Sequence, residues 1–235
     1  MNHVCLAYFP RSPDERGQTI EEHIIRGLEF LEEMYLERGF AEYLVRLAKY
    51  FKVELSLTES RNAIYASYIF HDLGKISKEY QEKKSGFSGH EIISAYWVME
   101  HGSQLALGKM LYHVALAIYL HHHDMRRGTK TLQKVNLCSE CLRKILDIYE
   151  GKTSINLASY KTRFRGELSS GLTRYLNRIE KEDVRLSYPL LQVVHGVDNY
   201  SALEREGKPS VLSTEVRKVV DAVRLLREDF GRVFR

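Results

Sequence analysis

His71-Asp72-Leu73-Gly74-Lys75 is the stretch of this sequence that most narrows the fold. Further ligand-type residues surround it in chain order, namely His23, His90, the run His121-His122-His123 and Asp198. Imidazoles and carboxylates from separate segments are the groups that a pair of divalent cations needs for attack on phosphate esters. We therefore expect a fold in which distant segments meet around a binuclear metal centre.

Apolar residues recur at helical spacing along most of the chain. Ile24, Leu28 and Leu31 lie on one stripe, and Thr19 with Glu22 forms a capping box at its start. We expect helices over residues 19–38, 41–51, 61–73, 90–100, 104–120, 132–149, 168–179, 189–204 and 214–230. The one strand candidate, residues 4–9, is too isolated to make a sheet. The predicted fold is all-α and compact, a single domain over residues 1–235 with the metal site at the centre of the helix bundle.

The composition indicates a globular protein without a membrane segment. Hydrophobic residues make up 44% of the chain and charged residues 28%. Neither a signal peptide nor a run of roughly 18 apolar residues is present, so we expect a cytoplasmic protein. Three cysteines, an odd number, fit a reducing compartment better than a disulfide framework. Cys138 and Cys141 form a lone CxxC that could supply half a zinc site, but buried thiols on one helix face are the favoured interpretation.

Basic residues gather after the histidine run. Residues 152–178 contain six basic residues and one acidic residue, a net charge of +5. Arg126, Arg127 and Lys130 follow the histidines directly. Such residues form either an ordinary solvated surface or a rim that attracts an anionic strand. We assign Arg126 and Arg127 to substrate binding.

The neighbouring positions of His71 and Asp72 restrict how they can share a site. Adjacent helical residues point about 100° apart, so both serve one centre only beyond a helix end or if two metals share the carboxylate. A bridging Asp72 would hold two cations roughly 3.5–4 Å apart, which suits phosphodiester hydrolysis. The Lys75 ammonium could neutralise developing phosphoryl charge. Mixed nitrogen and oxygen ligation suits manganese, iron, cobalt, nickel or zinc rather than magnesium alone.

The ordered set resembles the HD superfamily of metal-dependent phosphohydrolases, whose signature is H...HD...D. More narrowly, three features are similar to the stand-alone HD nuclease of CRISPR type I interference systems: Phe87-Ser88-Gly89-His90, Leu120-His121-His122 and Gly196-Val197-Asp198-Asn199. The resemblance covers about residues 23–202. It implies two divalent metal ions per chain, from among Mn, Ni, Co, Fe, Mg and Zn.

The resemblance also implies a role for each residue. One metal would be held by His23, His71, Asp72 and Asp198, and the second by His90, His121 and His122 with Asp72 shared. Asp72 and Lys75 would be the catalytic residues. His122 and His123 stay open as the alternative pair, and His195, one turn before Asp198, either supports the metal ligands or is simply packed.

The activity implied is metal-dependent endonucleolytic and exonucleolytic cleavage of single-stranded DNA in antiviral defence, with RNA as a further substrate of some members. A separate helicase subunit and the crRNA-guided surveillance complex would be partners, because this chain has no P-loop of its own. One alternative is an HD phosphohydrolase acting on nucleotides or cyclic nucleotides. Another is a regulatory module without metals, although no ligand position is missing here. The basic segment favours the open groove of a nuclease.

Overall fold

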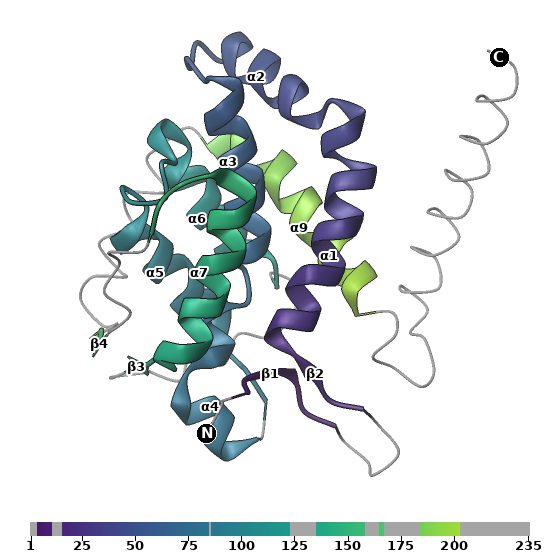
Figure 1. Ribbon diagram of the computed structural model, residues 1–235. Helices are drawn as coiled ribbons and strands as arrows, with labels where there is room; N and C mark the ends of the chain where they lie inside the picture. The colour runs from purple at the N-terminus through teal and green to yellow at the C-terminus, as the bar shows by residue number, and fades with distance from the viewer. Residues whose placement is uncertain are drawn as a thin grey trace, which may run out of the picture.

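Helices make up most of the described chain, as the apolar spacing predicts (Figure 1). The computed structural model describes residues 4–10, 16–84, 86–122, 135–157, 165–166 and 184–202. The α-helices are α1 (Ile20–Met34), α2 (Phe40–Tyr50), α3 (Leu57–Ile69), α4 (Lys78–Lys83), α5 (His90–His101), α6 (Leu111–Leu120), α7 (Ser139–Thr153) and α9 (Ser187–Ser201). Short 3-10 helices are η1 (Leu36–Arg38), η2 (Leu73–Ile76), η3 (Gly108–Met110) and η4 (Val184–Leu186). The all-α prediction is confirmed.

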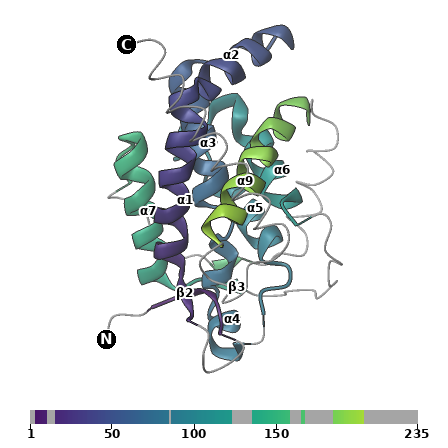
Figure 2. The ribbon, with the colours of Figure 1, turned by 90° about the vertical axis from the view of Figure 1, so that its right-hand side faces the viewer.

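Helix α3 is the central element of the bundle. It packs against α1, α2, α6, α7 and α9, and both ribbon views place it between α1 and α6 (Figures 1 and 2). Ala63, Ala66 and Ser67 are completely buried on this helix, and such small side chains allow neighbouring helices to approach closely. A helix that is enclosed on several sides needs no polar stripe. The chain segment after α3 therefore begins inside the molecule.

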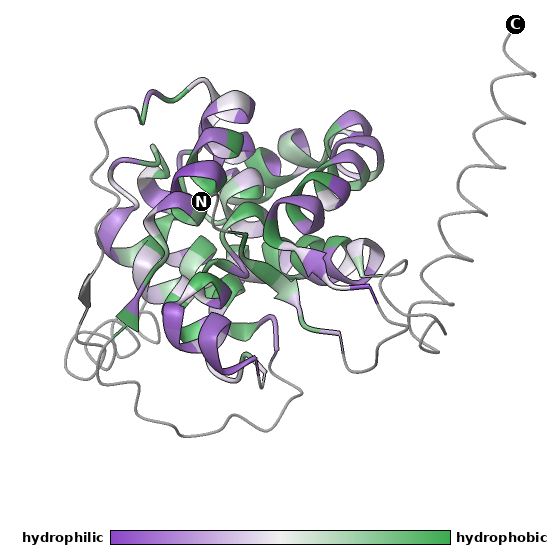
Figure 3. Cartoon of the chain, turned by 60° about the horizontal axis from the view of Figure 1, so that its bottom comes forward, coloured by the Kyte–Doolittle hydropathy of each residue, from purple (hydrophilic) through white to green (hydrophobic). Residues whose placement is uncertain are grey.

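The core is built from aromatic and aliphatic side chains around α3. Phe70, at the end of α3, packs against Trp97 with ring centroids 5.1 Å apart and against Tyr149 at 5.0 Å. All three are fully buried. Figure 3 shows the same segregation along the chain, with hydrophobic segments turned inward and hydrophilic ones outward. The segments that carry the predicted ligands are thus anchored to a continuous core.

Capping boxes fix the starts of α1 and α3. The Thr19 hydroxyl accepts from Glu22 N, and the Glu22 carboxylate accepts from Thr19 N, as predicted. Ser56 and Glu59 make the same pair of bonds before α3, which starts earlier than expected. The expected helix over 61–73 also ends earlier, at Ile69, so that His71 and Asp72 lie beyond its last turn.

Three other sequence expectations are wrong in detail. The strand within residues 4–9 is not isolated, because β1 (Leu6–Tyr8) pairs antiparallel with β2 (Gln18–Thr19). The expected helix over 104–120 begins only at α6, since Ala106 and Gly108 have positive φ angles of 49° and 51°. The helix expected over 132–149 begins at Ser139, because β3 (Val135–Asn136) pairs with β4 (Arg165–Gly166). The helices expected over 168–179 and 214–230 lie outside the described residues.

The cysteine expectation is also wrong. Cys5 and Cys141 form a disulfide, and Cys138 is the free, buried thiol. The partners are 136 residues apart in sequence, and they meet because the N-terminal strand runs past the start of α7. None of the described helices combines the length and the apolar run that a membrane crossing requires.

Candidate metal centre

The predicted ligands come from the ends of helices that converge on one region. Asp72 and His71 follow α3, and the other donors lie at helix termini or on α9. They are His23 in the first turn of α1, His90 at the start of α5, His121 and His122 at the end of α6, and Asp198 on α9. Because side chains beyond a helix terminus are not confined to one face, neighbouring residues such as His71 and Asp72 can both face the centre.

The structure brings all seven donors together in two groups that share Asp72. Within each group the ligand-type atoms lie within 4.8 Å of one another. The groups are His23, His71, Asp72 and Asp198, and Asp72, His90, His121 and His122. These are the two sets that the sequence resemblance implied for the two metals.

The carboxylate of Asp72 faces both groups with different oxygens. Its Oδ2 atom lies 3.5 Å from Nε2 of both His23 and His71. Its Oδ1 atom lies 2.9 Å from Nε2 of His90 and 3.7 Å from Nε2 of His121. A carboxylate with one oxygen toward each histidine group has the orientation that a bridging ligand needs.

Asp198 completes the first group from the far end of the chain. Its Oδ1 atom lies 3.2 Å from His23 Nε2 and 3.6 Å from His71 Nε2. Its side chain is 23% exposed, whereas those of His23 and His71 are fully buried. The first group therefore reaches the protein surface at Asp198.

Backbone carbonyls fix the orientation of three of the imidazole rings. The Nδ1 atoms of His71, His90 and His121 lie 2.5, 2.6 and 2.5 Å from the carbonyl oxygen three residues earlier. A carbonyl only accepts hydrogen bonds, so each Nδ1 carries the proton and each Nε2 of the neutral ring presents a lone pair. Metal-binding histidines are commonly held by such a bond on the other ring nitrogen.

The lone pairs that face Asp72 lack donors. Among the described residues, the buried Nε2 atoms of His71, His90 and His121 and the Oδ1 atom of Asp72 have no hydrogen-bond partner. Leaving one such buried group unsatisfied costs about 1–3 kcal/mol. A cation between the imidazole nitrogens and the carboxylate would satisfy all four, so the donor set fits divalent metal ions.

The comparisons with known proteins agree with this geometry. The family model described as HD domain matches residues 20–203, a range that contains all seven donors. This chain belongs to the HD domain family. The resemblance drawn from the sequence is thereby confirmed, whereas the single-domain prediction over residues 1–235 stays a prediction.

Two curated relatives of this HD domain carry the name CRISPR-associated endonuclease Cas3-HD. The one from Thermoproteus tenax is 30% identical over 131 residues, which are 52% of this chain and 46% of that protein. The one from Pyrococcus furiosus is 26% identical over 144 residues, 58% of this chain and 60% of that protein. The chain thus spans about half the length of the curated relatives it matches.

A solved structure shares the fold. It is the CRISPR-associated Cas3 HD domain protein of Methanocaldococcus jannaschii, with a TM-score of 0.50 and 16% sequence identity. The match covers 75% of this chain and 93% of that one. The helical architecture of the HD domain is therefore common to both chains.

The electrostatics of the centre suit metal ligation. Burial, reinforced by neighbouring histidines, lowers the pKa of His121 to about 4 and that of His122 to about 3. Burial alone would raise the pKa of Asp72, but His71 and Lys75 outweigh it and hold that pKa well below its usual value. At neutral pH His121 and His122 are therefore neutral and the Asp72 carboxylate is ionised, which are the protonation states that bind metals.

The Lys75 side chain lies against the carboxylate of Asp72. Its ammonium lies 2.5 Å from Asp72 Oδ2, and its side chain is 9% exposed. The backbone carbonyl of Lys75 accepts a hydrogen bond from Gln81 Nε2 at 2.8 Å. Lys75 therefore balances the negative charge of the Asp72 carboxylate, on the same oxygen that faces His23 and His71.

The remaining predicted residues divide into supporting and undescribed ones. His195 Nε2 hydrogen-bonds to the carbonyl oxygen of His121 at 2.7 Å, so His195 supports a ligand-bearing segment without joining either group. His113 is a buried residue whose Nδ1 atom lies 3.2 Å from Ser187 Oγ, and it joins neither donor group. His123, Arg126, Arg127 and Lys130 lie outside the described residues, while His121 and His122 both belong to the second group.

Sequence reasoning missed the residues that hold His23. Its Nδ1 atom lies 3.3 Å from Gln18 Oε1 and 3.1 Å from Ser201 Oγ. Gln18 Nε2 also donates to the carbonyl oxygen of Ser201 at 3.0 Å, which ties the start of α1 to the end of α9. A local sequence pattern does not predict contacts between residues that are 183 positions apart.

Two glycines permit the close packing around the ligands. A Cβ on Gly74 would overlap the carbonyl oxygen of His90, because η2 lies directly against the start of α5. Gly74 N donates to Ser94 Oγ, whose hydroxyl in turn donates to that carbonyl. On α1, a Cβ on Gly27 would overlap the hydroxyl of Tyr68. Gly74 was visible in the His-Asp motif, but nothing in the sequence marks Gly27.

Proposed function

We propose that this HD domain is a metal-dependent nuclease that cleaves single-stranded DNA by a two-metal mechanism in CRISPR type I interference. The observation that carries the proposal is the Asp72 carboxylate, whose two oxygens face two separate groups of histidines. The names of the two curated relatives support the nuclease activity and its CRISPR setting. RNA is a second substrate of the same chemistry.

Each donor has a defined part in this chemistry. When bound, a pair of divalent cations supplies an activated water and stabilises the leaving oxygen of the phosphodiester. Asp72 holds the two sites next to each other, and the carbonyl-anchored imidazoles keep their Nε2 lone pairs aimed at them. Lys75 offsets the charge of Asp72, which leaves the centre less negative toward a phosphate.

The exposure of the donors indicates where a strand would approach. His122 and Asp198 are partly exposed, while the other five donors are buried. The two partly exposed donors belong to different groups, and we propose that the phosphate approaches the centre past His122 and Asp198. Arg126 and Arg127 follow His122 closely in sequence, and we propose that they attract the nucleic-acid backbone there.

The partners follow from what this reaction requires. A single strand must be supplied from duplex DNA, and the sequence contains no P-loop for an ATP-driven motor. We propose that a separate helicase subunit and a crRNA-guided surveillance complex deliver the strand. No membrane is involved in this proposal.

The test compares Asp72→Asn with wild type on a single-stranded DNA oligonucleotide in the presence of Mn²⁺. We expect the variant to lose at least about 100-fold in cleavage rate, because it removes the bridging charge. Asp147→Asn is the matched control, since Asp147 lies on the exposed face of α7 in an ion pair with Arg143. Cleavage by Asp72→Asn at the wild-type rate would refute the proposed centre.

A panel of nucleotides and cyclic nucleotides belongs in the same assay. An enzyme that binds small substrates needs a closed pocket, whereas a strand needs an open site with basic walls. We expect turnover of the oligonucleotide and none of the small substrates. The reverse result would make the chain a nucleotide phosphohydrolase with the same metal centre.

A further inference from the structure

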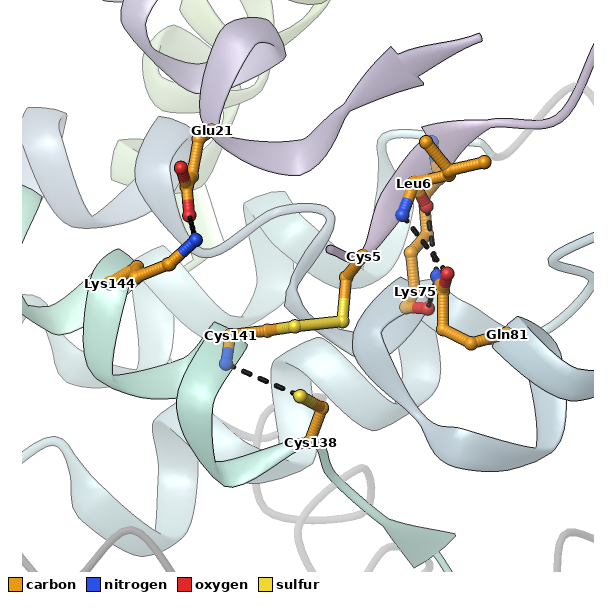
Figure 4. The surroundings of a disulfide bond; sticks show 8 residues. All are labelled: Cys5, Leu6, Glu21, Lys75, Gln81, Cys138, Cys141 and Lys144. Atoms are coloured by element: carbon orange, nitrogen blue, oxygen red, sulfur yellow. Dashed lines mark hydrogen bonds and ion pairs between the residues drawn. A yellow bond between two sulfur atoms is a disulfide. The ribbon is translucent and has the colours of Figure 1, made fainter. Parts of the chain in front are cut away.

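The three cysteines form a second cluster, which the nuclease chemistry does not use. Cys5 precedes β1, Cys138 is the N-cap of α7, and Cys141 lies in the first turn of that helix. Their sulfur atoms all lie within 4.8 Å of one another (Figure 4). Cys5 is 5% exposed, Cys138 9% and Cys141 1%. Three sulfurs from two distant segments thus share one small buried volume.

The helix start aims the free thiol at the disulfide. An N-cap side chain reaches toward the backbone N–H of the third helical residue. Here Cys138 Sγ accepts a hydrogen bond from Cys141 N at 3.3 Å, drawn as a dashed line in Figure 4. That bond places Cys138 Sγ beside the residue whose sulfur is joined to Cys5. The thiolate is the nucleophile in disulfide exchange.

We propose that Cys5, Cys138 and Cys141 form a thiol–disulfide exchange site. The Cys138 thiolate attacks Cys141 Sγ, the Cys138–Cys141 bond forms and the Cys5–Cys141 bond breaks. Cys5 leaves as a thiolate and takes up the proton that Cys138 released. Two electrons move within the sulfur cluster, and no external oxidant or reductant is consumed. This step is independent of the proposed nuclease function.

The exchange replaces a long-range cross-link by a local one. The Cys5–Cys141 bond joins segments 136 residues apart, whereas a Cys138–Cys141 bond would close a loop within the first turn of α7. After the exchange, hydrogen bonds and apolar packing would hold the N-terminal strand, whose Ala7 is buried in the core. Ile20 N donates to the carbonyl oxygen of Cys5 at 2.9 Å, and Leu6 exchanges two bonds with the Gln81 side chain.

The freed strand is connected to the metal centre. Gln81 Nε2 donates to the carbonyl oxygens of both Leu6 and Lys75, at 2.9 and 2.8 Å (Figure 4). Leu6 follows the exchanging Cys5, and Lys75 carries the ammonium that pairs with Asp72. A short hydrogen-bonded path therefore connects the cysteine cluster with the candidate metal centre.

Trapping with N-ethylmaleimide tests the exchange. The full chain, purified without reductant, is incubated with the reagent at about pH 8.5, where an ordinary thiol is half ionised. Linked and labelled peptides are then mapped by mass spectrometry. We expect molecules with labelled Cys5 and a Cys138–Cys141 bond to accumulate over about minutes to hours, the time of uncatalysed disulfide rearrangement. Label on Cys138 alone, with Cys5–Cys141 intact in every molecule, would overturn the proposal, as would label on all three cysteines at the start.

Cys138→Ser is the matched control. Serine is a favoured N-cap residue, so α7 keeps its start while the attacking sulfur is lost. In this variant we expect the Cys5–Cys141 bond to persist and Cys5 to stay unlabelled under the same conditions. Labelling of Cys5 in Cys138→Ser at the wild-type rate would mean that the disulfide opens by another route, and it would exclude Cys138 as the nucleophile.

Discussion

At the scale of single residues, Asp72 is the carboxylate that the two donor groups share. Because Asp72 contributes to both groups and His90 to one, Asp72→Asn should lose both metals, whereas His90→Ala should keep the metal of the first group. The asparagine oxygen still accepts from Lys75, so the folded state should survive. Elemental analysis after dialysis against Mn²⁺ measures the stoichiometry. Equal metal content in the two variants would argue against a bridging role for Asp72.

Gly27 allows a second prediction at the residue scale. A Cβ there would overlap the hydroxyl of Tyr68, which donates to the carbonyl oxygen of His23 at 2.9 Å. Gly27→Ala should therefore lower the free energy of unfolding by about 1–3 kcal/mol, the usual cost of overpacking. Gly151→Ala is the control, because a Cβ at that helical position meets no atom within 4 Å. It should gain up to about 1 kcal/mol in the same urea titration.

The donor residues could be predicted from the sequence, whereas the residues that support them could not. The donors were predictable because imidazoles and carboxylates are rare in a core and stood in a characteristic order. Gln18, Ser201 and Tyr68 were not, since their roles depend on contacts with His23 that only the folded chain creates. Lys75 was identified, but its pairing with Asp72 became visible only in three dimensions.

At the scale of elements, the cap of α3 is expected to stabilise the whole domain. Ser56→Ala removes the hydroxyl that accepts from Glu59 N, and it should cost about 1 kcal/mol in the free energy of unfolding. Thr58→Ala, an exposed change in the same helical turn, is the control and should cause no loss. Thermal or urea unfolding measures both. Equal stability of the two variants would contradict the capping role.

The capping box of Ser56 and Glu59 should also make the stabilisation of α3 depend on pH. Hydrogen bonds from the backbone and side chain of Ser56 lower the pKa of Glu59 in the folded protein. A lowered folded-state pKa means that the stabilisation is full above the unfolded pKa and is lost as the pH falls through the folded one. The stability difference between wild type and Ser56→Ala should therefore shrink in acid. A difference that grows as the pH falls would reverse the assigned sign.

Element boundaries were less predictable than element types. The capping box at Thr19 is a local signal, and it located the start of α1 correctly. The start of α6 depends on the positive φ angles of Ala106 and Gly108, and the start of α7 depends on the pairing of β3 with β4. The spacing of apolar residues indicates neither. Likewise, β1 depends on β2 as its hydrogen-bonding partner. The Cys5–Cys141 disulfide joins segments 136 residues apart, which no local sequence pattern indicates.

At the scale of the whole molecule, the centre joins segments that are otherwise held by apolar packing and a few hydrogen bonds. The first group connects α1, the end of α3 and α9, and the second connects α3, α5 and α6. Bound metal should therefore stabilise the fold as a whole, by about 2.7 kcal/mol at a metal concentration 100 times Kd. We expect Mn²⁺ to raise the Tm of the chelator-treated protein and excess EDTA to reverse the rise. Asp72→Asn should show little of this shift, because the unpaired lone pairs of His71, His90 and His121 no longer share a carboxylate. An equal Mn²⁺ shift in that variant would place the stabilising metal elsewhere in the molecule.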